Sequence, residues 1–266
     1  TGASGMIAQQ TNVDTIANNL SNVNTSGYKS EKTEFKSLLY QTLQTKTTSA
    51  NGEEKPISAQ VGLGTRVASN TSIFTQGSLI ANESKSAFAI EGNGLFSVRG
   101  ADGETYYTRN GNFSWVKDGN VVSLCTQEGY HVLDSNGNVI SLPANVSSES
   151  VEFQSNSGEI GYKDGAGNYH ALNRRIGIYQ FRNPAGLEKE SNSLLSVTEA
   201  SGDAMSEYTN NNLTRSKIVQ GYLEGSNVQL ADEMVNLIVA QRAYEMNSKV
   251  ITTSDDMLGI ANQLKR

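Results

Sequence analysis

The C-terminal part of the chain carries the pattern that most constrains the fold. Between Asn227 and Leu258 there is neither proline nor glycine, and Gly259 is the only glycine before Leu264. Apolar side chains recur here at helical spacing, with Gln241 as a polar member: Met234, Leu237, Ile238, Tyr244, Val250, Ile251, Met257, Ile260 and Leu264. We therefore predict one helix over residues 227–264, on the order of 50 Å long at about 1.5 Å per residue. Such a helix far exceeds the average globular length of about 11–12 residues, so its broad apolar stripe needs a partner.

A second helical pattern lies at the opposite end of the chain. Spacings of three and four positions predict a helix over residues 3–23, with Gln10 as the polar exception: Ala3, Met6, Gln10, Val13, Ala17 and Leu20. The asparagine-rich run that follows has low helix propensity, and Gly27 is a suitable helix stop. A further short helix is expected over residues 31–43, with apolar side chains on one side: Phe35, Leu38, Leu39 and Leu43.

The composition changes between residues 44 and 67. The stretch over residues 45–54 has few side chains that could be buried, and Asn51-Gly52 is a typical loop pair. These residues predict an extended arm, or a disordered linker if nothing covers them. The sequence leaves both possibilities open.

From about residue 73 to residue 201, short apolar runs alternate with turn signals. Asp-Gly and Asn-Gly pairs supply the positive φ angles of tight hairpins, as at Asp102-Gly103 and Asn110-Gly111. The runs between such turns are strand candidates: 87–90, 95–99, 106–108, 113–115, 121–124, 131–133, 151–153 and 176–181. Their regular spacing predicts an antiparallel all-β domain.

Together these patterns predict an α+β fold. The terminal helices are expected to pair as a coiled-coil hairpin, and the central antiparallel all-β domain lies between them in sequence. The expected domains are an N-terminal helical segment over 1–43, an extended arm over 44–72, a β domain over 73–218 and a long C-terminal helix over 219–266.

Composition argues against several classes of function. The net charge of −6 and the pI near 5.1 do not favour a nucleic-acid partner. Cys125 is the only cysteine, and the two histidines, His131 and His170, lack metal-ligand spacing, so we expect no metal and no cofactor. No apolar run approaches the roughly 20 residues of a bilayer span, and no cleavable signal peptide is visible.

Short motifs with catalytic associations do not combine into a site. Ser26-Gly27-Tyr28-Lys29 fits the pattern of a serine–lysine acylating site, but the partner motifs of that class are absent. The run over residues 134–138 resembles the start of a calcium loop without its later glutamate, so we expect a hairpin turn. We therefore predict no catalytic residues, no small-molecule substrate and no enzyme. A structural protein that assembles, or an adhesin-like β domain with helical stalks, remains.

The two helical stripes favour assembly. Isolated helices are marginal in water, and a large exposed apolar face marks an interaction surface. The helices could form only an intramolecular hairpin, or also pack against copies of the chain, and contacts that close no ring produce a filament. Asn18 and Asn19 are expected to fix the register of neighbouring helices. The candidate interface residues are Met6, Gln10, Val13, Ala17, Asn18, Asn19, Leu20, Met234, Leu237, Ile238, Gln241, Tyr244, Ile251 and Met257.

Several stretches resemble the flagellar rod and hook family. Residues 9–29 (QQTNVDTIANNLSNVNTSGYK) are similar to the N-terminal signature of that family. Residues 221–228 (GYLEGSNV) and 241–249 (QRAYEMNSK) are similar to its C-terminal helix and the segment before it. Residues 92–96 (GNGLF) and 107–113 (YTRNGNF) are similar to its β-domain core. The resemblance spans nearly the whole chain.

The resemblance implies a hollow helical tube with helical hairpins inside and β domains outside, which passes motor torque to the hook. It implies export by the flagellar type III apparatus without a cleaved signal peptide, and a location in the basal body within the cell envelope. The implied partners are copies of the chain, other rod and hook subunits, and ring proteins around the rod. Chain length and the insertion over residues 44–67 favour a distal rod subunit, with a hook or proximal rod subunit as the alternative.

Overall fold

The computed structural model describes residues 1–44, 59–119, 121–143, 146, 150–154, 158–164, 168–210 and 212–264. The chain forms two compact units. The helical unit comprises Thr1–Ser21, Glu31–Ser72 and Gln229–Arg266, and the β unit comprises Asn22–Ser30 and Ile73–Val228. Within the described residues, no helix has the length and apolar character that a membrane span requires.

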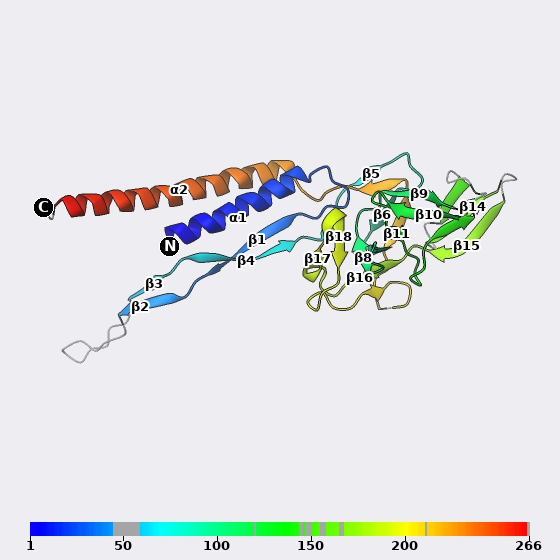
Figure 1. Cartoon of the computed structure of the whole chain (residues 1–266), viewed down its shortest axis with the longest axis horizontal. Helices are drawn as coiled ribbons and strands as arrows, with labels where there is room; N and C mark the ends of the chain where they lie inside the picture. Colours follow the sequence, from blue (N-terminus) through cyan, green and yellow to red (C-terminus); the bar gives the residue numbers. More distant parts are fainter. Residues whose placement is uncertain are drawn as a thin grey trace. The chain divides into compact units, whose positions relative to one another are not determined.

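Two helices from opposite ends of the chain form the helical unit. Helix α1 spans Gly2–Ser21 and helix α2 spans Leu230–Gln263, which confirms both terminal helices predicted from the sequence. They lie side by side and run antiparallel (Figure 1), with Gly2 beside Ile251 and Gly5 beside Asn247. A Cβ atom added at Gly5 would lie only 3.1 Å from the amide group of Asn247, so the missing side chain lets the helices approach closely.

Residues 31–44 form strands, so the helix expected over residues 31–43 was wrong. Strand β1 (Glu31–Ser37) pairs antiparallel with β4 (Thr65–Ser72), and β2 (Tyr40–Gln44) pairs with β3 (Ala59–Gly62). The few apolar residues gave a weak helical period here, but hydrogen bonding to a partner strand decided the outcome. That partner lies more than twenty residues away in sequence, where local patterns do not reveal it.

The β1–β4 ladder lies against α1 (Figure 1). The Thr33 hydroxyl donates to the Thr15 hydroxyl over 2.9 Å, and the Asn70 amide donates to Thr15 over 3.2 Å. Part of the expected extended arm is therefore the returning half of a hairpin. Residues 45–58 lie outside the described residues, so both possibilities for them stay open.

The β unit is built from short antiparallel strands, as predicted. Its largest sheet has the order β12-β10-β11-β7-β8-β18-β17, with β9 beside β10 and β16 joining β7 to β19. The strands of that sheet are β7 (Leu95–Arg99), β8 (Thr105–Thr108), β9 (Phe113–Asp118), β10 (Val121–Thr126), β11 (His131–Val132), β12 (Ser141–Pro143), β16 (Ile178–Gln180), β17 (Glu188–Lys189), β18 (Leu194–Ser196) and β19 (Met205–Ser206).

Smaller sheets complete the unit. The strands β13, β14 and β15 form one sheet, β20 pairs with β6, and β21 pairs with β5. Their bounds are β5 (Leu79–Ala81), β6 (Phe88–Glu91), β13 (Val151–Gln154), β14 (Glu159–Lys163), β15 (Tyr169–Arg175), β20 (Lys217–Gln220) and β21 (Tyr222–Glu224). The Asp134 carboxylate accepts hydrogen bonds from the backbone of Asn136 and Asn138, which confirms the expected turn there.

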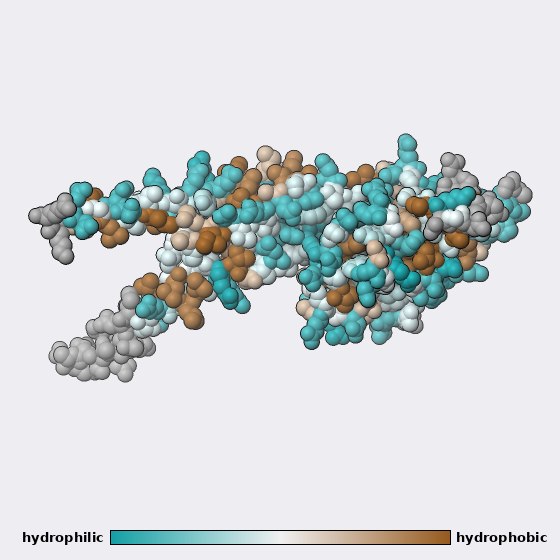
Figure 2. All heavy atoms as spheres, in the orientation of Figure 1, coloured by the Kyte–Doolittle hydropathy of each residue, from teal (hydrophilic) through white to brown (hydrophobic). Residues whose placement is uncertain are grey.

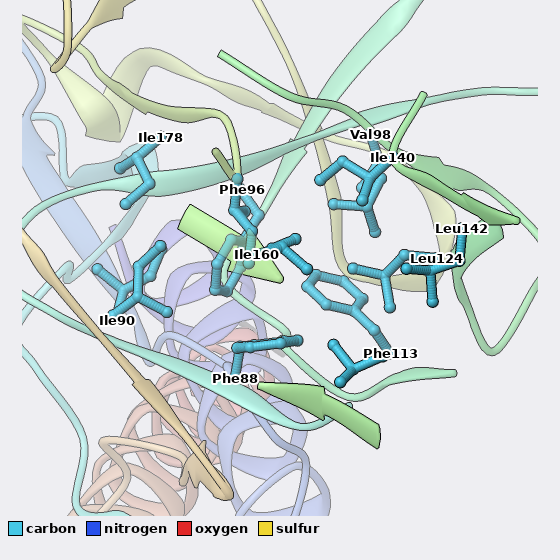
Figure 3. Packing of buried hydrophobic residues seen from close by; sticks show 14 of the residues in the cluster. Phe88, Ile90, Phe96, Val98, Phe113, Leu124, Ile140, Leu142, Ile160 and Ile178 are labelled. Carbon is cyan, nitrogen blue, oxygen red and sulfur yellow. The ribbon is translucent and has the colours of Figure 1, made fainter. Parts of the chain in front are cut away.

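The core of the β unit is aromatic and aliphatic. Phe88, Phe96 and Ile90 are each fully buried (Figure 3). The ring of Phe96 meets that of Phe113 edge to face at a centroid distance of 5.1 Å, an arrangement that adds to the gain from burial. Trp115, the only tryptophan, packs against this core and therefore reports on it alone.

We expect Phe96→Ala to lower the free energy of unfolding of the β unit by about 3–5 kcal/mol, because it leaves a cavity in a closely packed core. The measurement is urea denaturation of the full chain, followed by Trp115 fluorescence. Val116→Ala is the matched control, because Val116 is 45% exposed, and it should cost roughly 0.5 kcal/mol or less. Equal losses for both variants would contradict this core assignment.

Candidate functional site

Four of the sequence-predicted interface residues meet where α1 lies along α2. Gln10 and Val13 from α1, with Gln241 and Tyr244 from α2, line a shallow groove of about 330 Å³ that Glu245 completes. Tyr244 is 40% exposed, and Val13 is half-buried. The groove is mainly apolar and lies within the helical unit, and Gln10 and Gln241 on its edges are exposed to solvent.

The other predicted residues of α1 differ in environment. Ala17 and Asn18 are exposed, whereas Met6 and Leu20 are half-buried. Asn19 is 1% exposed, and its amide donates to the Glu31 carbonyl while its oxygen accepts from the Glu31 backbone N–H. Asn19 therefore holds α1 to β1 of its own chain. The register role expected for it between helices stays a prediction, as does that of Asn18.

Most predicted residues of α2 remain accessible. Met234, Ile238 and Met257 are between 50% and 61% exposed, while Leu237 is half-buried. Ile251 is 37% exposed and packs against Gly2 of α1. The pairing with α1 therefore uses one side of α2 and leaves much of its apolar surface in contact with solvent.

A second apolar row on α2 was not anticipated as such. We call it the outer stripe, and it consists of Val235, Val239, Met246, Val250, Met257 and Leu264. These side chains are 58–82% exposed, and brown apolar atoms are visible along α2 in Figure 2. They recur at spacings of four and seven, which places them on one face of a helix. The sequence prediction named only Met257 among its interface residues and missed Val235, Val239 and Met246.

The missed residues had a usable signal. Leu264, Met257 and Val250 follow one another at intervals of seven residues. Met246 lies four residues before Val250, and Val239 lies seven residues before Met246. In the sequence, the apolar residues of the helix form one broad stripe. The structure separates that stripe into a side that packs on α1 and an outer stripe.

A further apolar surface lies on the hairpin of the helical unit. Leu39 is 83% exposed, Tyr40 is 64% exposed, and Val61 and Leu63 are 47% and 48% exposed. These residues belong to β2, β3 and the short connections that join them to β1 and β4. The helical unit thus presents two separate apolar surfaces of its own.

The β unit contains a buried ionic cluster formed by Lys29, Arg109 and Glu224. The Lys29 ammonium lies 2.7 Å from Glu224 Oε1, and Arg109 Nε donates to Glu224 Oε2. Their side chains are 6%, 5% and 1% exposed. Each group therefore depends on the others for its partner, because burying an unpaired charge is costly.

Further hydrogen bonds complete the cluster. Lys29 also donates to the Thr75 carbonyl over 2.7 Å, and Glu224 Oε1 accepts from the Gly77 backbone N–H over 2.8 Å. Arg109 donates to the backbone carbonyls of Ile90, Gly92 and Gly94. The second cation is therefore balanced by carbonyl dipoles rather than by another carboxylate.

Two glycines, each two residues from a cation of the cluster in sequence, let the backbone approach neighbouring segments closely. Gly27 has φ of +71°, and a Cβ atom there would lie 2.6 Å from the Asn110 backbone nitrogen. A Cβ atom at Gly111 would lie 1.6 Å from the Phe88 carbonyl oxygen. Neither position can accept a side chain without backbone movement. Gly27 instead donates its N–H to the Glu224 carbonyl over 2.8 Å.

Burial lowers the pKa of Lys29 below its ordinary value of 10.5. The hydrogen bond and the charge of Glu224 raise that pKa without fully offsetting burial, and the charge of Arg109 lowers it further. The protonated lysine is therefore less favourable in the folded chain than in the unfolded one.

This pKa shift predicts a pH dependence. Above its lowered folded pKa, Lys29 loses a proton in the folded chain that the unfolded chain keeps up to about pH 10.5, so stability rises with pH in that window. The unmodified chain should therefore gain stability relative to Lys29→Met as the pH approaches 10.5. Tyr107, whose pKa burial raises to about 12, is present in both chains and cancels. Urea denaturation read by Trp115 fluorescence measures the free energy of unfolding of the two chains at each pH. If Lys29→Met gains stability relative to the unmodified chain as the pH rises, the assignment is contradicted.

Comparison with known proteins agrees with this architecture. Three family profiles match: "Flagella basal body rod protein" over residues 1–29, "Flagellar hook protein FlgE/F/G D1 domain" over residues 89–162, and "Flagellar basal body rod FlgEFG protein C-terminal" over residues 219–264. The first and third cover the terminal helices, and the second covers most of the main sheet.

Several relatives named FlgG align over nearly their whole length. The flagellar basal-body rod protein FlgG of Borreliella burgdorferi is 43% identical, with 100% of this chain and 97% of the relative aligned. FlgG of Agrobacterium fabrum is 40% identical, with 98% of this chain and 96% of the relative aligned. FlgG of Bacillus subtilis is 36% identical, with 100% of this chain and 97% of the relative aligned. The chain therefore belongs to the FlgG family of flagellar basal-body rod proteins, and it is a structural subunit of the distal rod rather than an enzyme.

Proposed function

We propose that the chain polymerises with copies of itself into a helical tube, and that the outer stripe of α2 is the main contact between copies. The observation that carries this proposal is the exposure of 58–82% at every side chain of the outer stripe. Monomeric soluble proteins rarely leave so extended an apolar row in water. A second copy that covers the stripe would remove this surface from solvent.

The occupant we propose is a helix of a neighbouring copy. Spacings of four and seven are those of a helix that packs side chains into the gaps of another helix. The helical unit also carries exposed apolar residues elsewhere, on the hairpin around Leu39 and Tyr40. If the neighbouring helix meets the outer stripe through a different surface from its own outer stripe, the contact is head-to-tail and continues as an open filament.

Within one copy, we propose that α1 and α2 form a coiled-coil hairpin that makes the inner layer of the tube. Their antiparallel packing through Gly2, Gly5, Val13 and Tyr244 supports this arrangement. The β unit would then form the outer layer. Torque from the motor would pass mainly through the packed helices, and the arm over residues 44–67 would stiffen the tube against neighbouring copies.

We propose that the tube works in the basal body within the cell envelope and joins other rod and hook subunits at its ends. Ring proteins around the rod are further proposed partners. Export through the flagellar type III apparatus without a cleaved signal peptide belongs to the same proposal. The division of the chain into four parts, with boundaries after residues 43, 72 and 218, stays a prediction.

The central experiment compares polymerisation of three chains. Val250→Glu combined with Met257→Glu places two charges on the outer stripe and should raise the critical concentration for polymerisation at least about tenfold, which corresponds to about 1.4 kcal/mol. Asn236→Glu combined with Ser254→Glu places the same charges at exposed polar positions of α2. This control pair should change the critical concentration much less. Sedimentation and electron microscopy measure the polymer.

Both pairs should leave the Trp115 unfolding curve unchanged, because α2 is not part of the β unit. The proposal fails if the two pairs polymerise equally well, or if the unmodified chain remains monomeric at every concentration tested. Deletion of residues 230–263 should likewise abolish polymerisation and retain the β unit, so a deleted chain that still polymerises would exclude α2 as the contact.

A further inference from the structure

Three sequence stretches that carry the family resemblance meet at one carboxylate. The first contains Gly27 and Lys29, the second contains Arg109, and the third contains Glu224. Lys29 and Arg109 are 80 positions apart in sequence, and Arg109 and Glu224 are 115 positions apart. In the β unit the three stretches converge on Glu224. Neither catalysis nor the proposed helix contacts gives these buried charges a role.

The cluster lies where the chain enters and leaves the β unit. The chain passes between the two units after Ser21, Ser30, Ser72 and Val228. The segment of residues 22–30 therefore follows α1 directly, and the segment of residues 222–228 leads directly into α2. Lys29 belongs to the first segment and Glu224 to the second, so their ion pair joins the two segments that continue into the terminal helices.

Asn227 ties the same segments a second time. Its Oδ1 accepts from the Ser30 backbone N–H over 2.7 Å, and its Nδ2 donates to the Ile73 carbonyl over 2.8 Å. Ile73 in turn donates its backbone N–H to the Ser30 carbonyl over 2.8 Å. Three of the four points at which the chain crosses between units are thus joined by direct hydrogen bonds.

The chemistry of the cluster suits fixing the geometry of the two segments better than adding stability to the whole β unit. Buried ion pairs add little net stability compared with apolar contacts, but they tolerate few alternative arrangements. Glu224 uses both carboxylate oxygens on Lys29, Arg109 and Gly77, and its own carbonyl accepts from Gly27. Removal of its charge would leave two cations buried beside each other.

We propose that Glu224 is a positioning residue for assembly. Its carboxylate locks residues 22–30 to residues 222–228, so that α1 and α2 continue from one fixed frame of the β unit. The part that concerns assembly rests on the proposed function, whereas the lock itself is a property of the single chain. A purely structural brace would act differently, because its loss would loosen the whole β unit rather than the junction.

The test combines hydrogen exchange with polymerisation. In monomeric Glu224→Gln, the amides of residues 27–30, 77 and 225–228 should exchange at least about tenfold faster than in the unmodified chain. Amides of β7 and β10 should change less than about twofold. The critical concentration for polymerisation should rise in parallel with the loosening of the junction.

Two further chains sharpen the test. Lys29→Met with Glu224→Gln removes both charges and should recover part of the lost protection, because no unpaired lysine remains. Glu152→Gln is the control, since it breaks the Glu152–Lys163 pair in the same unit, whose side chains are 44% and 47% exposed. It should alter neither exchange at the junction nor polymerisation. If Glu224→Gln does not fold, Lys29→Met alone gives the same comparison.

The outcomes separate this inference from the proposed function. Uniformly faster exchange across the β unit, or unchanged exchange at the junction, overturns the lock. A loosened junction with normal polymerisation overturns the role of Glu224 in assembly. If the unmodified chain does not polymerise, the proposed function fails, while the exchange data still decide whether Glu224 locks the two segments.

Discussion

The surface of α2 is larger than one chain can bury, and the architecture follows from that constraint. The helix has 34 residues, and α1 has only 20, so α1 covers one side of it over part of its length. Among the described residues of α2, Ala240 alone is fully buried. Apolar side chains left in water favour association, and a helix with two apolar sides can pair within its chain and between chains at once.

The ionic cluster meets a different requirement. The proposed transmission of torque requires that the segments leading to the two terminal helices belong to one piece of well-packed structure. Apolar packing in the β unit, around Phe88 and Phe96, supplies the stability of that piece. Lys29, Arg109 and Glu224 supply directional bonds at the points where the chain leaves it. Stability and geometry are thus assigned to different groups of residues.

Sequence patterns predicted those elements whose signal is local. The terminal helices and the strands β6–β11, β13 and β16 follow from helical spacing and from Asp-Gly or Asn-Gly turns. The strands β1 to β4 were not predicted, because β1 gains its stability from β4, far along the chain. Weak local periodicity around Leu38 and Leu39 suggested a helix instead.

The candidate site was predicted in part, since heptad spacing marks Met257. Which side of α2 is covered by α1 depends on the three-dimensional packing, so the sequence could not show it. The ionic cluster was missed because Lys29 and Glu224 are 195 positions apart.

The most direct measurement is the accessibility of the outer stripe before and after polymerisation. Val239→Cys places a thiol at a position that is 62% exposed in the single chain, whereas the native Cys125 is only 2% exposed and should react slowly. If copies cover the outer stripe, the labelling rate of residue 239 should fall at least about tenfold in the polymer. A polymer in which this thiol reacts as fast as in the monomer would show that copies assemble through another surface.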